Sequence, residues 1–197
     1  MTHETPQEKG LHLIAELRKP RKKCDTTLCL QLIDDGAALN AQDNDGGTAL
    51  IHAAWKGHTD IVHTLLDKGA AMDVQDNEKN TALIYAIYRN HPSIAHALLN
   101  KGAAMDTQNN HGNTALIYAV YQEHTDISHT LLNKGADAGL KTNEGKTAWD
   151  IATEKGYHAL AQIIHDYHTR QTFTAAAAAG TTQPRKIRRP AATRKLR

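Results

Sequence analysis

The residues best suited to bind a metal ion in this chain are its histidines, of which there are 13. His63, His96 and His129 recur at one constant interval. Copies on successive stacked helices would lie about 8–10 Å apart, too far to share a zinc ion whose bonds are about 2 Å long. His165 and His168 could pair on one helix, but no third ligand accompanies them. The sequence therefore predicts no metal site and no cofactor.

The two cysteines are the candidate nucleophiles. Cys24 follows Lys22 and Lys23, which should lower the pKa of its thiol. Cys29 shares its place in the repeat with small residues expected in the core, namely Val62, Ala95, Ser128 and Ala161. No companion base, glycine-rich phosphate loop or pair of carboxylates is evident, so we predict that the protein is not an enzyme. Two cysteines are too few for a disulfide framework, which favours a reducing compartment.

The spacing of the histidines belongs to a repeat that runs through most of the chain. Thr-Ala-Leu, or Thr-Ala-Trp in the last copy, begins at Thr48, Thr81, Thr114 and Thr147, a period of about 33 residues. Leucine pairs and Gly-Ala pairs keep the same period. A constant period of this length indicates an array of similar structural units.

Each unit predicts two short helices. Thr48 is placed to cap a helix over residues 49–56, and the apolar residues from Ile61 to Leu66 share one face of a second helix that Gly69 ends. Helices of fewer than about ten residues are not stable alone in water. The units must therefore stack on one another.

In its period and motifs the chain resembles the ankyrin repeat. The resemblance implies an all-α solenoid of stacked helix-turn-helix units joined by β-turn loops. The chain departs from the family pattern after the capping threonine, where alanine replaces proline and isoleucine replaces histidine in the three internal units (Ala49, Ala82 and Ala115; Ile51, Ile84 and Ile117). This argues against the family's usual side-chain hydrogen bonding around the turn. Lys79 replaces a glycine, should have a positive φ, and is expected to make its turn the loosest.

Five units are predicted, at about residues 8–42, 43–75, 76–108, 109–141 and 142–168. Pro20 excludes a helix at the usual place in the first unit, so that helix is predicted at Glu8–Leu17, followed by a basic loop over Arg18–Lys23. The last unit is polar, as a cap requires. Residues 1–7 are expected to be disordered, as is an Ala/Thr-rich and basic tail over residues 169–197.

The resemblance also implies that the concave face and the turn tips bind a protein partner. By position, the binding residues on the helices are Trp55, Lys56, Tyr88, Arg89, Tyr121, Gln122 and Lys155, and those at the tips are Asp45, Glu78, His111 and Glu144. Trp, Tyr and Arg are the residues most enriched in binding hot spots. The remaining periodic residues are assigned to packing (Tyr85 and Tyr118), turn formation (Asn44, Asn77, Asn110 and Asn143) and a solvated row (Lys68, Lys101 and Lys134).

The end of the chain is strongly basic. Seven of the 23 Lys and Arg residues lie within residues 185–197, which contain no acid, so the rest of the chain carries a net charge of −5. These seven are Arg185, Lys186, Arg188, Arg189, Arg194, Lys195 and Arg197. The segment resembles a nuclear-localisation signal, whose partner would be a nuclear-import receptor. A contact with nucleic-acid phosphates or an anionic membrane surface, and a solubilising role only, are the alternatives.

The function predicted from these features is a monomeric, non-enzymatic adaptor that binds an unidentified protein. No apolar run approaches the ~20 residues of a membrane span and no signal peptide is evident, so a cytoplasmic or nuclear location is predicted. One alternative is a nucleic-acid- or chromatin-associated regulator that uses the basic tail. Another is an effector that an intracellular bacterium delivers into a host cell, since the chain resembles such ankyrin proteins in size and architecture.

Overall fold

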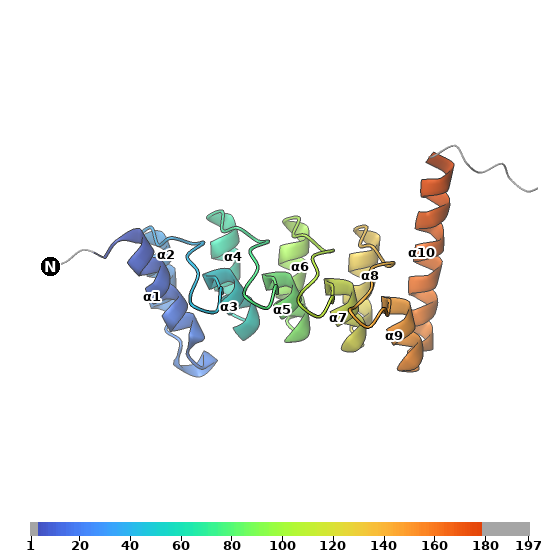
Figure 1. Cartoon of the computed structure of the whole chain (residues 1–197). Helices are drawn as coiled ribbons and strands as arrows, with labels where there is room; N and C mark the ends of the chain where they lie inside the picture. The colour runs from blue at the N-terminus through green and yellow to red at the C-terminus, as the bar shows by residue number, and fades with distance from the viewer. Residues whose placement is uncertain (1–3, 179–197) are drawn as a thin grey trace, which may run out of the picture.

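The computed structural model describes residues 4–178, and side chains as far as residue 172. Within this range the chain is helical and contains no strand, and its helices form a row of stacked pairs (Figure 1). The first helices of the pairs are α1 (Pro6–Arg18), α3 (Ala49–Lys56), α5 (Ala82–Tyr88), α7 (Ala115–Tyr121) and α9 (Ala148–Glu154). The second helices are α2 (Thr26–Asp34), α4 (Thr59–Asp67), α6 (Pro92–Asn100), α8 (Thr125–Asn133) and α10 (His158–Ala178). A 3₁₀ helix, η1 (Arg21–Lys23), connects α1 to α2. The all-α solenoid predicted from the sequence is confirmed.

The predicted caps begin and end the helices of the repeat. The Thr48 side chain accepts a hydrogen bond from the backbone N–H of Ile51, and Thr81 and Thr114 do the same in the next two units. Helix α3 has the bounds that the sequence predicts. Gly69 follows α4 with φ +83°, a left-handed conformation that glycine adopts without strain.

The core is a continuous layer of apolar residues between neighbouring pairs. Leu65, Leu98 and Leu131, which occupy the same place in three units, are fully buried. Helix α5 packs against α3, α6 and α7, so each internal helix pair is covered on both sides. Burial of one such leucine contributes about 1.5–3 kcal/mol, and only the stacked array provides it.

The asparagines of the turns connect one unit to the next. The side-chain amide of Asn77 donates to the backbone oxygen of Asn44 at 3.0 Å, that of Asn110 to Asn77 at 3.1 Å, and that of Asn143 to Asn110 at 2.8 Å. The side chains of Asn77, Asn110 and Asn143 therefore join neighbouring repeats, which is a structural role.

The lysine row at the ends of the second helices is exposed and partly paired. Lys68 lies 2.9 Å from Asp34, and Lys101 lies 2.9 Å from Asp67, each pair joining neighbouring repeats. Ion pairs at such exposed sites contribute little to stability.

Both ends of the array extend further than the sequence predicts. Helix α1 begins at Pro6 instead of Glu8, because Thr5 and Glu8 form a capping box. Helix α10 continues past residue 168 to Ala178, through the start of the segment expected to be disordered. Residues 179–197, which include the predicted basic targeting segment, lie outside the described residues.

Three of the described residues other than glycine have a positive φ: Lys79 (58°), Asn90 (56°) and Glu123 (57°). The positive φ predicted for Lys79 is confirmed. Glu123 stands where the second unit has Gly57 and the last has Gly156, both also left-handed. The left-handed conformation costs a residue with a Cβ atom roughly 1–2 kcal/mol.

Replacing Glu123 with glycine is expected to raise the free energy of unfolding by up to about 1 kcal/mol, because the relief of strain exceeds the extra chain entropy that glycine loses. Urea denaturation followed by circular dichroism measures the change. Gln122→Gly is the matched control, since Gln122 has an ordinary φ of −95° and its replacement should destabilise the protein. Destabilisation of similar size by both substitutions would contradict the argument.

Candidate functional site

Five aromatic side chains form a continuous row along α3, α5 and α7, which we call the aromatic row: Trp55, Tyr85, Tyr88, Tyr118 and Tyr121. The Trp55 ring stacks on Tyr88 with centroids 5.9 Å apart and meets Tyr85 edge-on at 4.8 Å. Tyr118 meets Tyr88 at 5.7 Å and Tyr121 at 6.5 Å. Tyr88 is 44% exposed, and the other four are partly buried. The row therefore crosses three repeats as one surface.

Cationic side chains lie against this row without a carboxylate partner. The Arg89 guanidinium carbon is 4.7 Å from the centroid of the Trp55 ring, and the Lys155 ammonium is 5.7 Å from that of Tyr121. Within the part of the chain that the structure describes, no carboxylate lies within ion-pair distance of Lys56, Arg89 or Lys155. A cation over an aromatic ring is stabilised by about 0.5–1 kcal/mol at exposed sites and keeps its charge available to a ligand.

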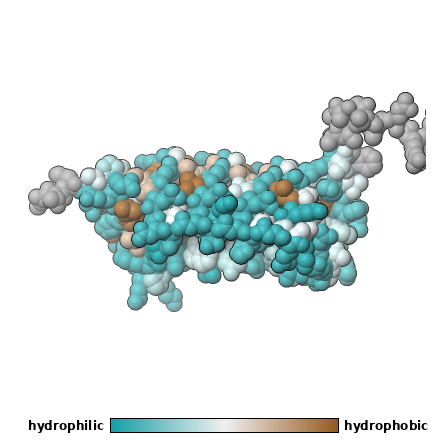
Figure 2. Space-filling view, viewed as in Figure 1, coloured by the Kyte–Doolittle hydropathy of each residue, from teal (hydrophilic) through white to brown (hydrophobic). Residues whose placement is uncertain are grey.

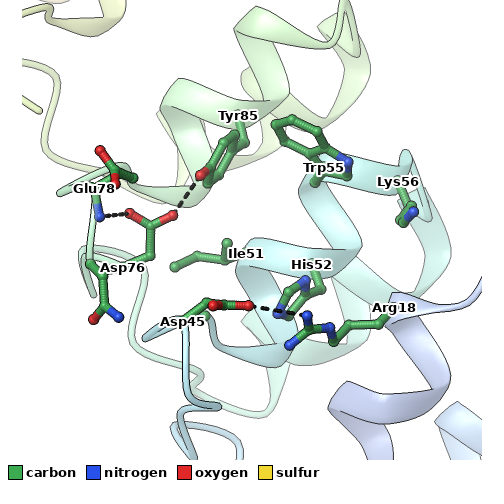
Figure 3. Close-up of a pocket in the computed structure, with 11 residues that line it drawn as sticks. Arg18, Asp45, Ile51, His52, Trp55, Lys56, Asp76, Glu78 and Tyr85 are labelled. Carbon is green, nitrogen blue, oxygen red and sulfur yellow. Dashed lines mark hydrogen bonds and ion pairs between the residues drawn. The ribbon is translucent and has the colours of Figure 1, made fainter. Parts of the chain in front are cut away.

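A pocket of about 600 Å³ opens between α3, α5 and the turns that precede them (Figure 3). Trp55 and Tyr85 lie on one side of the pocket and Asp45 lies on the other side. Ile51 lies between the two sides. Asp76 and Glu78 lie at the turn before α5. The remaining charged groups that line the pocket are Arg18, Asp45 and Lys56.

A second pocket, of about 450 Å³, lies two repeats further along. Six of the predicted binding residues line it: Tyr88, His111, Tyr121, Gln122, Glu144 and Lys155. The first pocket holds four others: Asp45, Trp55, Lys56 and Glu78. Arg89 lies outside both pockets, on the Trp55 ring. The binding positions that the resemblance implied are thus gathered around two pockets on one face. We call the aromatic row together with these two pockets the groove.

Tyr85 and Tyr118, which the sequence assigned to packing, also belong to the aromatic row. The Tyr85 hydroxyl donates to a carboxylate oxygen of Asp76 at 2.5 Å, and the Tyr118 hydroxyl accepts from the Asn109 amide at 2.9 Å. These bonds hold the inner rings in place between the outer ones. In the sequence, Tyr85 and Tyr118 each stand three residues before an outer tyrosine, Tyr88 or Tyr121, and this spacing was the signal that they belong to the same row.

In the second unit, the corresponding turn is held by Asp43. One carboxylate oxygen lies 2.9 Å from His52 and 2.7 Å from Arg18, and the other accepts from the backbone N–H of Gly47. This residue and its counterparts Asp76 and Asn109 each accept hydrogen bonds from backbone N–H groups of their own turns. Burial alone would raise the pKa of Asp43, but the bonds from Gly47 and His52 outweigh it and the pKa lies below its ordinary value.

Because its folded-state pKa is lowered, Asp43 stabilises the protein above the ordinary aspartate pKa of about 3.9, and this contribution is lost as the pH falls through the lowered value. Asp43→Asn keeps an acceptor for the turn but removes the charge. At pH 7 it is expected to lower the free energy of unfolding by about 1.5–3 kcal/mol, and the difference from wild type should shrink below about pH 4. Urea titrations across this range measure it, with the exposed Asp45→Asn as control. A difference that stays constant down to pH 2 would be inconsistent with this role.

The cysteines are arranged differently from the prediction for Cys24. Its sulfur lies 3.9 Å from that of Cys29, and burial raises its pKa, so the expectation that the neighbouring lysines lower it is wrong. Burial also raises the pKa of Cys29 to about 12. Neither thiol is therefore activated as a nucleophile.

Among residues 4–178 no three side chains of the His, Cys, Asp or Glu type gather to hold a metal ion. No helix within these described residues combines the length and the hydropathy needed to cross a membrane.

The repeat period, the capped helix pairs and the stacked core are together typical of a helical repeat protein. A family model of three ankyrin repeats matches residues 11–109 and again 97–174. The chain belongs to the ankyrin-repeat family. No curated protein matches this ankyrin-repeat chain. Ankyrin repeats are generally protein–protein interaction modules, and the groove lies on the first helices and turns of this one.

Proposed function

We propose that this ankyrin-repeat protein is a non-enzymatic adaptor that binds a protein partner through the groove. The observation that carries the proposal is the aromatic row, which presents an exposed Tyr88 between half-buried neighbours. Aromatic residues and arginine dominate binding hot spots, because they offer large contact areas at low entropic cost. The face seen in Figure 2 is mainly hydrophilic, with separate hydrophobic residues and no broad apolar patch.

The turn tips supply polar groups at the border of the groove. Asp45, Glu78 and Glu144 are exposed there, and His111 lines the second pocket. Polar groups at a border contribute orientation and association rate more than affinity. We assign the energy of binding to the aromatic row and the choice of register to the tips.

The basic tail is assigned a targeting role, with a nuclear-import receptor as its partner. A chromatin- or nucleic-acid-associated function is the second candidate, supported by seven basic residues without an acid in residues 185–197. Phosphate binding depends steeply on salt. A salt titration of DNA and RNA binding, with and without residues 184–197, separates the two.

The test of the adaptor function is a pull-down from a eukaryotic lysate with identification by mass spectrometry. Wild type is compared with Trp55→Ala/Tyr88→Ala/Tyr121→Ala, after circular dichroism shows that the variant folds. Trp149→Ala is the control, because Trp149 is 42% exposed but lies outside the groove. Proteins retained by wild type and the control, and lost by the triple variant, support the proposal. Identical captures by all three would reject it.

A further inference from the structure

The region where each first helix ends and leads into the second helix carries cations that recur with the repeat. Lys23, Lys56 and Arg89 occupy the same place in three successive units, and Arg21 and Lys22 lie beside the first of them on η1. We call these five residues the cationic edge. Among the described residues, none of the five has a carboxylate within ion-pair distance. Arg18, Lys68 and Lys101, in contrast, each contact an aspartate at 2.7–3.0 Å.

Arg21 extends this positive surface to the beginnings of α4 and α6, in the second and third units. It lines one pocket with His58 and Thr59 and a second with Asn90 and His91. Both pockets lie at the beginning of second helices, α4 and α6, where the helix dipole adds positive potential. The acid among the residues that line them is Asp60, in the first turn of α4.

Two histidines lie at this edge, His58 buried and His91 partly buried. Burial, together with the charge of Arg21, lowers the pKa of His58 and of His91, although a bond to the Trp55 carbonyl opposes the shift at His91. The positive charge of the edge at pH 7 therefore comes from its lysines and arginines.

The cationic edge is continuous with the groove. Lys56 lines the pocket formed by Trp55 and Tyr85, and Arg89 lies on the Trp55 ring. A ligand that covers the aromatic row must therefore also pass these unpaired cations. Arg89, Tyr85 and Tyr88 already contact Trp55, so the ring has little room for a stacked nucleic-acid base.

We propose that the partner segment bound in the groove has apolar side chains against the aromatic row and carboxylates along Lys23, Lys56 and Arg89. These cations lie at or just after the ends of first helices, whereas the acidic tips Asp45, Glu78 and Glu144 precede first helices, so the acidic side of the partner faces the cationic edge. This inference rests on the proposed protein-binding function and specifies its partner. Stacked helices lie about 8–10 Å apart. Successive cations are therefore matched by carboxylates about three residues apart in a polyproline II segment, which rises about 3.1 Å per residue and repeats its side-chain direction every three residues.

The test is selection of a random peptide library displayed on phage against the whole protein. Selected peptides are then measured against Lys56→Glu/Arg89→Glu and against Lys134→Glu/Lys141→Glu, which makes the same change in net charge away from the edge. Trp55→Ala/Tyr88→Ala reports groove binding independently of charge.

The expected result is enrichment of peptides with a net negative charge. They should bind the edge variant at least about tenfold more weakly than wild type, a difference of about 1.4 kcal/mol, and bind the control variant nearly as well as wild type. Peptides without acidic bias that still require Trp55 and Tyr88 would overturn the inference and leave the proposed function standing. If no peptide depends on Trp55 and Tyr88 and the edge reversal weakens only DNA binding, the edge is a phosphate contact and both proposals fail.

Discussion

Replacing Leu98 with alanine is expected to lower the free energy of unfolding by about 2–5 kcal/mol, the largest stability effect that we foresee for a single substitution. Leu98 lies on α6 in the middle of the array and is fully buried. Its removal leaves a cavity in the continuous core that joins neighbouring units, so the damage should weaken coupling between the two halves of the array.

Urea denaturation followed by circular dichroism measures this loss. Leu11→Ala is the matched control, since Leu11 is 42% exposed on α1 and should change stability by no more than about 0.5 kcal/mol. A broader, less cooperative transition in Leu98→Ala would be a further sign of uncoupled repeats. Equal effects of the two substitutions would show that this core layer does not hold the array together.

The triple variant Trp55→Ala/Tyr88→Ala/Tyr121→Ala is expected to weaken the affinity for the captured partner at least about 1000-fold. Single hot-spot truncations typically cost about 2–4 kcal/mol, and about 4.1 kcal/mol corresponds to a factor of 1000. The three rings are joined through Tyr118 and, at Trp55, by direct stacking, so their contributions should not be additive.

Isothermal titration calorimetry of the partner with each variant gives the affinities. The same proteins must show an unchanged midpoint of unfolding within a few degrees, because Trp55 also contacts Tyr85 and Arg89 and its loss could loosen the groove. A triple variant that folds and binds with wild-type affinity would place recognition elsewhere on the molecule.

The repeated motifs predict most of the fold because local and global signals agree. Thr48 caps the helix, Gly69 ends the next one, and the constant repeat period places the leucines in register. The cap and the stop signal depend on backbone geometry within a single unit, and the leucine register depends on hydrophobic residues that each unit repeats. The same period identifies the positions of the groove residues.

The length of α10 was not predictable from local composition. Five consecutive alanines are too short to nucleate a helix in water, and this argued for disorder after residue 168. In the folded protein, α10 is already nucleated by packing of residues such as Leu160 and Ile164 against the preceding unit. Extension into Ala-rich sequence then adds a hydrogen bond for each residue ordered, which is favourable.

The sequence also could not give the contacts between side chains of different repeats. The aromatic row depends on rings from neighbouring helices that meet at about 5–6 Å, which periodicity alone does not determine. For Cys24, the adjacent lysines indicated a lowered pKa, whereas burial beside Cys29 raises it. Burial depends on the fold of the whole first unit.

The most direct test of the groove as the binding surface is the affinity of the captured partner for two variants, each of which loses an aromatic side chain of similar fractional exposure. Tyr88 and Trp149 are 44% and 42% exposed, but Tyr88 lies at the centre of the aromatic row and Trp149 lies beside His165 on the last unit. We expect Tyr88→Ala to weaken binding at least about tenfold and Trp149→Ala to change it by less than about twofold. Equal losses, or a larger loss for Trp149→Ala, would contradict the assignment of the groove.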